Sequence, residues 1–144
     1  PAIRHCGDRA AYSPLSDAIR MPQRDMFTSA DHYYATLFHE LGHATGHRRR
    51  LNRTPIGNST LPAFGTPEYA AEELVAEISA AFVNGEAGLD PNLLDASASY
   101  LASWLPALKN DKRLILVAAG RAQHAADWIL NRRQATTATE PVAA

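Results

Sequence analysis

The segment His39-Glu40-Leu41-Gly42-His43 limits the fold of this chain more than any other segment, because its histidines act together only on a helix. Residues four apart on a helix lie about 40° apart around its axis, so both imidazoles can reach one metal ion. Glu40 stands where zinc hydrolases keep the base that activates a metal-bound water. With this content of His and Glu, the pattern arises by chance with a probability of about 1%. The motif therefore predicts a helical metal site that still needs a third protein ligand.

The size and composition are those of one soluble globular domain, with 144 residues of which 46% are hydrophobic and 20% charged. A net charge of −1 gives no overall attraction to nucleic acid or to an acidic membrane. No apolar run approaches the roughly 18 residues of a membrane span, and nothing resembles a signal peptide. Cys6 is the only cysteine, which excludes an internal disulfide and favours a reducing, cytoplasmic setting. Because the chain opens at Pro1 in what reads as mid-domain, we expect a piece of a longer protein.

Turn residues and helix-capping signals predict a small sheet followed by about four helices. We expect a β-hairpin within residues 1–27, with short strands around 10–12 and 18–21. Capping side chains and helix-ending glycines then predict the helices, which cover residues 29–46, 67–84, 96–109 with an interruption at Pro106, and 111–133. In the last helix the buried side is expected to hold Leu114, Ile115, Val117, Ala118, Ala122, Ala125, Ile129 and Leu130. The fold class is α+β, with one domain over 1–133 and a disordered tail over 134–144.

Two acids on the second predicted helix are candidates for the missing ligand. Glu73 and Glu77 are four residues apart and share a face flanked by apolar residues, where a charge is costly unless a cation pairs with it. A catalytic zinc takes three protein ligands and leaves one position for water. We assign Glu73 as the ligand and Glu77 as the acid that receives the other ring N–H of a histidine ligand. The reverse assignment stays open, as does a solvated acidic face formed by Glu72, Glu73 and Glu77.

His47 and the tyrosines are candidates for substrate contacts. His47 directly follows Gly46, whereas Arg49 occupies the place of the third histidine in the longer three-histidine motif, so that class of site is disfavoured. We expect His47 to contact substrate or to cap the helix end, with a plain surface histidine as the alternative. Four tyrosines are core or rim residues by default, but one of them could lie near the metal and donate a hydrogen bond to a developing oxyanion, with Tyr100 as the candidate substrate contact. These are Tyr33, Tyr34, Tyr69 and Tyr100.

Four arginines lie close together after the first predicted helix, at Arg48, Arg49, Arg50 and Arg53. Clustered guanidinium groups neutralise phosphates, which makes this cluster a candidate for nucleic-acid contact. The alternative is a solvated loop without a ligand.

The residues around these motifs follow an order found in one known family. The matching stretches are 11–14, 17, 19, 21–22, 33–47, 50–53, 64–65, 69–70, 72–77, 99–100, 103–104, 109–113 and 125–127. Over about residues 2–131 the chain resembles the C-terminal zincin-like domain of ArdC-type antirestriction proteins. That domain also occurs in TraC-like primases of conjugative plasmids and in polyvalent proteins of mobile elements and phages. The chain departs from the family pattern at Ala44, where an aromatic residue is usual, and at Pro106.

The resemblance implies a fold like that of the gluzincins, the zinc peptidases with a glutamate ligand, and Zn²⁺ as the cofactor. In the family this domain follows an N-terminal domain that binds single-stranded DNA, and the whole protein shields incoming plasmid DNA from restriction. We expect that N-terminal domain to be absent from this chain, so that single-stranded DNA would be bound through the missing part.

Three functions are compatible with these residues. The first is a zinc metallopeptidase in which His39, His43 and Glu73 hold the metal and Glu40 moves the proton, with an edge strand of the hairpin holding the peptide. The second is a catalytically silent, zinc-stabilised module that binds single-stranded DNA or a protein partner. The third is metal-assisted hydrolysis of a non-peptide bond by the same residues. Each of the three leaves the identity of the substrate or partner open.

Overall fold

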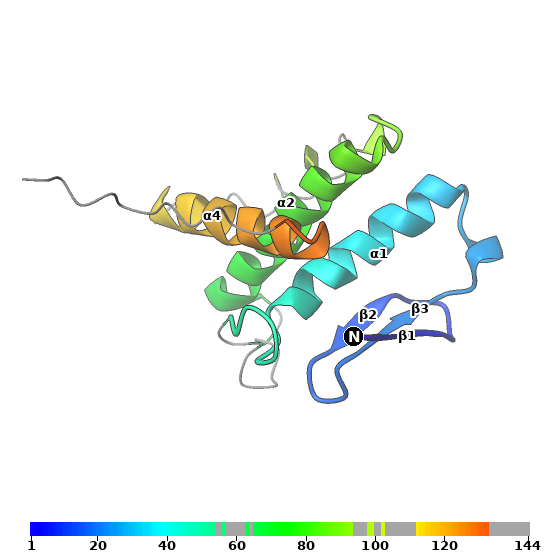
Figure 1. Ribbon diagram of the computed structural model, residues 1–144, viewed down its shortest axis with the longest axis horizontal. Coiled ribbons are helices and arrows are strands. Elements are labelled where there is room, and N and C mark those ends of the chain that lie inside the picture. Colours follow the sequence, from blue (N-terminus) through cyan, green and yellow to red (C-terminus); the bar gives the residue numbers. More distant parts are fainter. Residues whose placement is uncertain are drawn as a thin grey trace, which may run out of the picture.

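The computed structural model describes residues 1–53, 56, 63, 65–93, 98, 99, 102 and 112–132. A small sheet precedes the helices, and helix α1 lies between the sheet and the other two helices (Figure 1). The elements are β1 (Ala2–His5), β2 (Ala11–Ser13), β3 (Ala18–Met21), a 3₁₀ turn η1 (Arg24–Met26), α1 (Ala30–Thr45), α2 (Pro67–Ala87) and α4 (Lys112–Ile129). The predicted α+β class is therefore confirmed. The predicted helix over 96–109 lies mostly outside the described residues, and the predicted tail over 134–144 lies wholly outside them.

The sheet has three strands in the order β1-β3-β2. Strands β2 and β3 form the predicted antiparallel hairpin, with Tyr12 opposite Ile19. Strand β1 was not predicted, and it pairs parallel with β3 from Ala2 opposite Ala18 to His5 opposite Met21. All four residues of β1 are exposed, so the strand lacks the alternation of apolar and polar residues that marks a half-buried strand.

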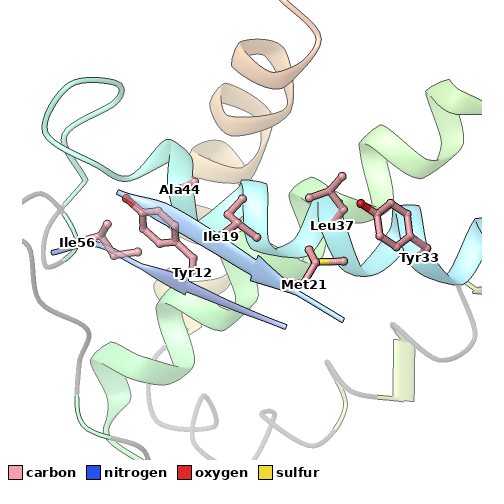
Figure 2. Close-up of a cluster of buried hydrophobic side chains, with 7 residues drawn as sticks. All are labelled: Tyr12, Ile19, Met21, Tyr33, Leu37, Ala44 and Ile56. Carbon is pink, nitrogen blue, oxygen red and sulfur yellow. The ribbon is translucent and has the colours of Figure 1, made fainter. Parts of the chain in front are cut away.

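The main hydrophobic core lies between the sheet and α1 (Figure 2). Ile19 and Met21 of β3 are fully buried there, and Tyr12 of β2 is almost fully buried. They form one cluster with Tyr33, Leu37 and Ala44 of α1 and with Ile56. Burying side chains of this size stabilises the fold by about 1.5–3 kcal/mol each. Because Tyr12 packs in this cluster, β2 is fixed beside the histidine-containing half of α1.

The ends of α1 and α2 follow their capping residues. Ser29 caps α1 by accepting a hydrogen bond from the amide of His32, and the helix stops at Gly46 as predicted. Thr66 caps α2 in the same way. Helix α2 continues beyond the predicted end at residue 84 and stops before Gly88, which has a left-handed φ of 67°. Of the two glycines that the sequence offers as stops, Gly88 ends the helix and Gly85 does not, because a glycine inside a helix weakens it by only about 1 kcal/mol whereas a left-handed glycine ends it.

Helix α4 buries fewer of its residues than predicted. Ala118, Ala122, Ala125 and Ala126 are buried, and Ala118, Ala122 and the partly buried Leu114 pack with Leu74 and Val75 of α2. Ile115 and Val117 were predicted to be buried, but they are 39% and 47% exposed. Val117 stands about 100° around the helix from Ala118 and so points away from the contact with α2. No helix in the described part of the chain is long and apolar enough to span a membrane.

Helices α1 and α2 approach each other closely at Gly42. A Cβ atom at this position would lie 2.6 Å from Ser79 Oγ and 2.9 Å from Ala76 Cα, both on α2. Only hydrogen fits in this space. The missing side chain therefore lets the histidine-bearing face of α1 meet the acidic face of α2.

We predict that Gly42→Ala lowers the free energy of unfolding by about 1–3 kcal/mol, because the added methyl group forces the two helices apart. Gly120→Ala is the matched control, since a Cβ atom on Gly120 of α4 meets nothing within 4 Å. The control should leave stability unchanged or raise it by up to about 1 kcal/mol through helix propensity. Urea unfolding followed by circular dichroism measures both. Equal stability of Gly42→Ala and the wild type would show that the contact is not tight.

Candidate metal site

His39 and His43 of α1 and Glu73 of α2 form a group that could hold one metal ion. One ligand atom from each residue lies within 4.8 Å of the others. The Nε2 atom of His39 is 3.7 Å from Glu73 Oε2, and the Nε2 atom of His43 is 3.4 Å from Glu73 Oε1. Ligands of a tetrahedral zinc ion lie about 3.3 Å apart, given Zn–N and Zn–O bonds of about 2.0–2.1 Å. Two imidazoles and one carboxylate at these distances fit zinc.

A carboxylate lies against the other ring nitrogen of each histidine. Glu77 Oε2 is 2.8 Å from Nδ1 of His39, and Glu72 Oε1 is 3.2 Å from Nδ1 of His43. When Nδ1–H donates to a carboxylate, the lone pair of Nε2 is directed at the metal position and the ring cannot rotate. Glu77 lies where we expected an orienting acid. The role of Glu72 was not predicted, because the sequence pattern offered it only as part of an acidic face.

Arg53 is the counter-ion that allows Glu72 to be buried. Its Nε donates to Glu72 Oε2 at 2.8 Å, and its Nη2 donates to Glu72 Oε1 at 2.6 Å. Further hydrogen bonds run from Arg53 to Thr45 Oγ1 and to the carbonyl of Gly42, both at 3.0 Å. Burial opposes ionisation of Glu72, but the hydrogen bonds from Arg53 and His43 outweigh it and lower the pKa of Glu72. The prediction that Arg53 contacts nucleic acid is wrong, because this side chain is buried inside the protein.

The acids around His43 favour a positive charge at the centre of the group. Burial by itself would lower the pKa of His43. Hydrogen bonds to Glu72 and Glu73, together with the attraction of their charges, instead raise the pKa of His43 to about 10. A divalent ion placed between the two Nε2 atoms and Glu73 would supply such a charge, and the histidines would then bind it in their neutral form.

Glu40 and Tyr69 complete the lining of a pocket of about 220 Å³ beside this group. Its walls are formed by Ala10, Ala11, Tyr12, His39, Glu40, His43, Tyr69, Glu72 and Glu73. Glu40 Oε2 accepts a hydrogen bond of 2.7 Å from the amide of Tyr12, on the edge strand β2. Burial, the charge of Glu73 and a hydrogen bond to its carboxylate, and the charge of Glu40 raise the pKa of Tyr69 to about 12. Among the four tyrosines singled out from the sequence, Tyr69 is the one that lines the pocket in the described part of the chain, and Tyr100 lies outside that part.

The segment after α1 folds back onto the helix end, so its polar residues do not all face solvent. Arg50 Nε donates to the carbonyl of Ala44 at 2.6 Å, and the guanidinium group forms an ion pair with Asp17 in the β2–β3 turn. The hydrogen bond from Arg50 is the main cause that lowers the pKa of Asp17 to about 2. His47 is buried, with Nδ1 at 3.9 Å from Asp17 Oδ2, and it does not line the pocket.

Two predictions for this segment are therefore corrected. Arg50 joins the end of α1 to the hairpin, so the structure does not place it at a nucleic acid. His47 is buried and does not line the pocket, and its Nδ1 accepts a hydrogen bond of 3.3 Å from the amide of Arg49. Arg48 and Arg49 are exposed, and they are the part of the predicted arginine cluster that remains at the surface.

Comparison with known proteins agrees with this geometry. Residues 1–121 match the family described as zincin-like metallopeptidase. The chain belongs to this family. Crystal structures of the antirestriction protein ArdC from plasmid R388 share the zincin-like fold of the chain. The Mn(II)-bound ArdC structure has a TM-score of 0.72 and 46% identity, over 91% of this chain and 47% of ArdC. The metal-free ArdC structure has a TM-score of 0.70 and 45% identity, over 91% of this chain and 46% of ArdC.

Curated relatives are similar over most of this chain. The uncharacterized protein y4eC of Sinorhizobium fredii is 42% identical over 127 residues, which are 88% of this chain and 40% of y4eC. A DNA primase TraC of Escherichia coli is 43% identical over 126 residues, which are 86% of this chain and 8% of the primase. The chain thus spans less than half the length of each of these relatives.

We predict that Glu73→Gln weakens zinc binding more than Glu77→Gln does, because Glu73 faces both Nε2 atoms whereas Glu77 orients one ring. The loss should be about 10–100-fold for Glu77→Gln, as for other residues that orient a ligand, and larger for Glu73→Gln. Titration against a chromophoric chelator measures both affinities. Glu86→Gln, an exposed acid on the same helix, serves as the control with unchanged affinity. A larger loss of zinc affinity in Glu77→Gln than in Glu73→Gln would show that Glu77 is the ligand.

Proposed function

We propose that this chain is the zinc-dependent metallopeptidase domain of an antirestriction-type protein from a plasmid or another mobile element, acting in the cytoplasm. The observation that carries the proposal is the meeting of His39, His43 and Glu73 beside Glu40, in one pocket walled by an edge strand. This donor set and a neighbouring acid are what hydrolysis by a zinc-activated water requires.

Each side chain of the pocket has a distinct task in the proposed reaction. His39, His43 and Glu73 would hold zinc, which would supply the Lewis acidity that activates a water for attack. Glu40 would accept a proton from the attacking water and deliver it to the leaving amine. Tyr69 keeps its proton at neutral pH because its pKa is about 12, so its hydroxyl can donate to the oxygen that becomes negative.

The edge strand supports a peptide or protein as the substrate. β2 lies at one edge of the sheet, and Ala10, Ala11 and Tyr12 form one wall of the pocket. An extended peptide could add to such an edge through main-chain hydrogen bonds. The small side chains of Ala10 and Ala11 leave room for this strand next to Glu40.

The relatives suggest a setting connected with DNA. ArdC is named an antirestriction protein and TraC a DNA primase, and in each of them the similar region is less than half of the whole protein. We infer that this domain acts together with further parts of a longer protein, and that single-stranded DNA is bound through those parts.

We predict that Glu40→Gln reduces hydrolysis by at least about 100-fold, because the amide cannot accept the proton, while zinc stays bound. The assay compares cleavage of unfolded protein and of restriction-enzyme subunits by the zinc-loaded wild type and variant. Zinc content of both proteins is measured by elemental analysis. Full cleavage by the zinc-loaded variant would remove Glu40 from the mechanism.

We predict that Tyr69→Phe lowers kcat by about 100-fold with little change in KM, because the lost hydroxyl group acts on charge that develops in the transition state. Tyr34→Phe changes a tyrosine outside the pocket and should leave both constants unchanged. Steady-state kinetics on one peptide substrate measures the two variants. An unchanged kcat for Tyr69→Phe would assign the oxyanion to another donor.

The alternative function is a catalytically silent, zinc-stabilised module that binds single-stranded DNA or a protein partner. Its support is the exposure of Arg48 and Arg49, neither of which forms an ion pair with another described residue. If these residues contact phosphates, Arg48→Ala/Arg49→Ala should weaken binding to an oligothymidine and make it less dependent on salt. Unchanged affinity measured by fluorescence anisotropy would remove this alternative for DNA.

A further inference from the structure

The amide of Tyr12 on β2 is directed at Glu40 rather than at the neighbouring strand. Residues that face each other in an antiparallel pair alternate between hydrogen-bonded and non-hydrogen-bonded pairs. Tyr12 faces Ile19 of β3, but its N–H donates to Glu40 Oε2 at 2.7 Å. The N–H and the C=O of Tyr12 therefore both point to the open edge of the sheet. The position of β2 relative to α1 decides whether this hydrogen bond can form.

A second set of hydrogen bonds fixes that position from the side chain of Tyr12. The Tyr12 hydroxyl donates to Asp17 Oδ1 at 3.0 Å and accepts from Arg50 Nη2 at 3.2 Å. Arg50 Nη1 donates to Asp17 Oδ2 at 3.1 Å, and Arg50 Nε donates to the carbonyl of Ala44 on α1. The connections form a closed ring that leaves α1 at Ala44, passes through Arg50, Asp17 and Tyr12, and returns to α1 at Glu40.

The backbone of Asp17 supports this interpretation. Its φ of 47° lies in the left-handed region, which is unfavourable for residues other than glycine, although aspartate tolerates it better than most. Such a conformation persists where the surroundings hold it, and it often marks a functional site. Here Arg50 and Tyr12 hold the carboxylate of Asp17 at the turn that leads from β2 into β3.

We propose that Arg50 and Asp17 are positioning residues for Glu40, because they hold β2 at the place where the Tyr12 amide binds the Glu40 carboxylate. The proposal rests on the proposed function in one respect, namely that Glu40 is the catalytic base. The hydrogen bond from Tyr12 orients the carboxylate in the pocket, next to His39 and His43.

The test compares Asp17→Asn and Arg50→Met with the wild type, all loaded with zinc. The first readout is the ¹H–¹⁵N resonance of the Tyr12 amide, assigned by selective labelling. In both variants the Tyr12 resonance should move toward its position in Glu40→Ala, which lacks the carboxylate that accepts the hydrogen bond. Zinc affinity should stay the same. The second readout is kinetic, and kcat should fall about tenfold or more with a change in KM below about threefold.

Two further variants complete the design. Arg132→Met breaks the exposed ion pair with Glu86 and should change neither readout, which controls for the loss of an arginine. Arg50→Lys keeps the charge and replaces Arg50→Met in the test if that variant does not fold. It should move the Tyr12 amide resonance in the same direction, because a lysine cannot bridge Ala44, Asp17 and Tyr12 together. A Tyr12 resonance that stays at its wild-type position in folded Asp17→Asn and Arg50→Lys would overturn the proposal. The same resonance decides the outcome even if the wild type hydrolyses no peptide, so failure of the proposed function is recognised separately.

Discussion

The contact between α1 and α2 at Gly42 is the constraint on which the rest of the site depends. With no side chain at Gly42, Ala76 and Ser79 of α2 come close to the backbone of α1. The two histidines one turn apart on α1 then face the acids on α2 directly. The helices need no intervening loop to build the site, and such rigid elements hold ligands more accurately than loops do.

This contact brings four acids into a small volume, and each has a different set of partners. Glu72 pairs with Arg53, Glu77 lies against His39, and Glu40 accepts the amide of Tyr12. Glu73 faces the Nε2 atoms of both histidines. Buried charges are tolerated only when they are paired or bind a metal, so the distribution of partners indicates which acid is the ligand. The partners also distinguish Glu40, the proposed base, from Glu72 and Glu77, which orient the histidine rings.

Local signals in the sequence were sufficient for much of the fold. The cap at Ser29, the stop at Gly46 and the turn between β2 and β3 were all readable from neighbouring residues. Strand β1 was not, because it is exposed on every residue and is held by a parallel pairing with β3 that no local pattern encodes. The ion pairs and hydrogen bonds of the site could not be predicted either where the two partners are far apart in the sequence. Arg53 and Glu72 are 19 residues apart, and Arg50 and Asp17 are 33 residues apart, so the sequence alone predicts one surface group for four arginines of which two have buried or distant partners.

The membership of the zincin-like metallopeptidase family and the geometry of the site lead to one central claim, that His39, His43 and Glu73 together hold a zinc ion. X-ray absorption at the zinc edge of the zinc-loaded protein tests it most directly. The account predicts two imidazole nitrogens and one or two carboxylate or water oxygens at about 2.0–2.1 Å, with one oxygen altered in Glu73→Ala. A shell of six oxygens, a shell with fewer than two imidazoles, or an unchanged shell in Glu73→Ala would contradict it.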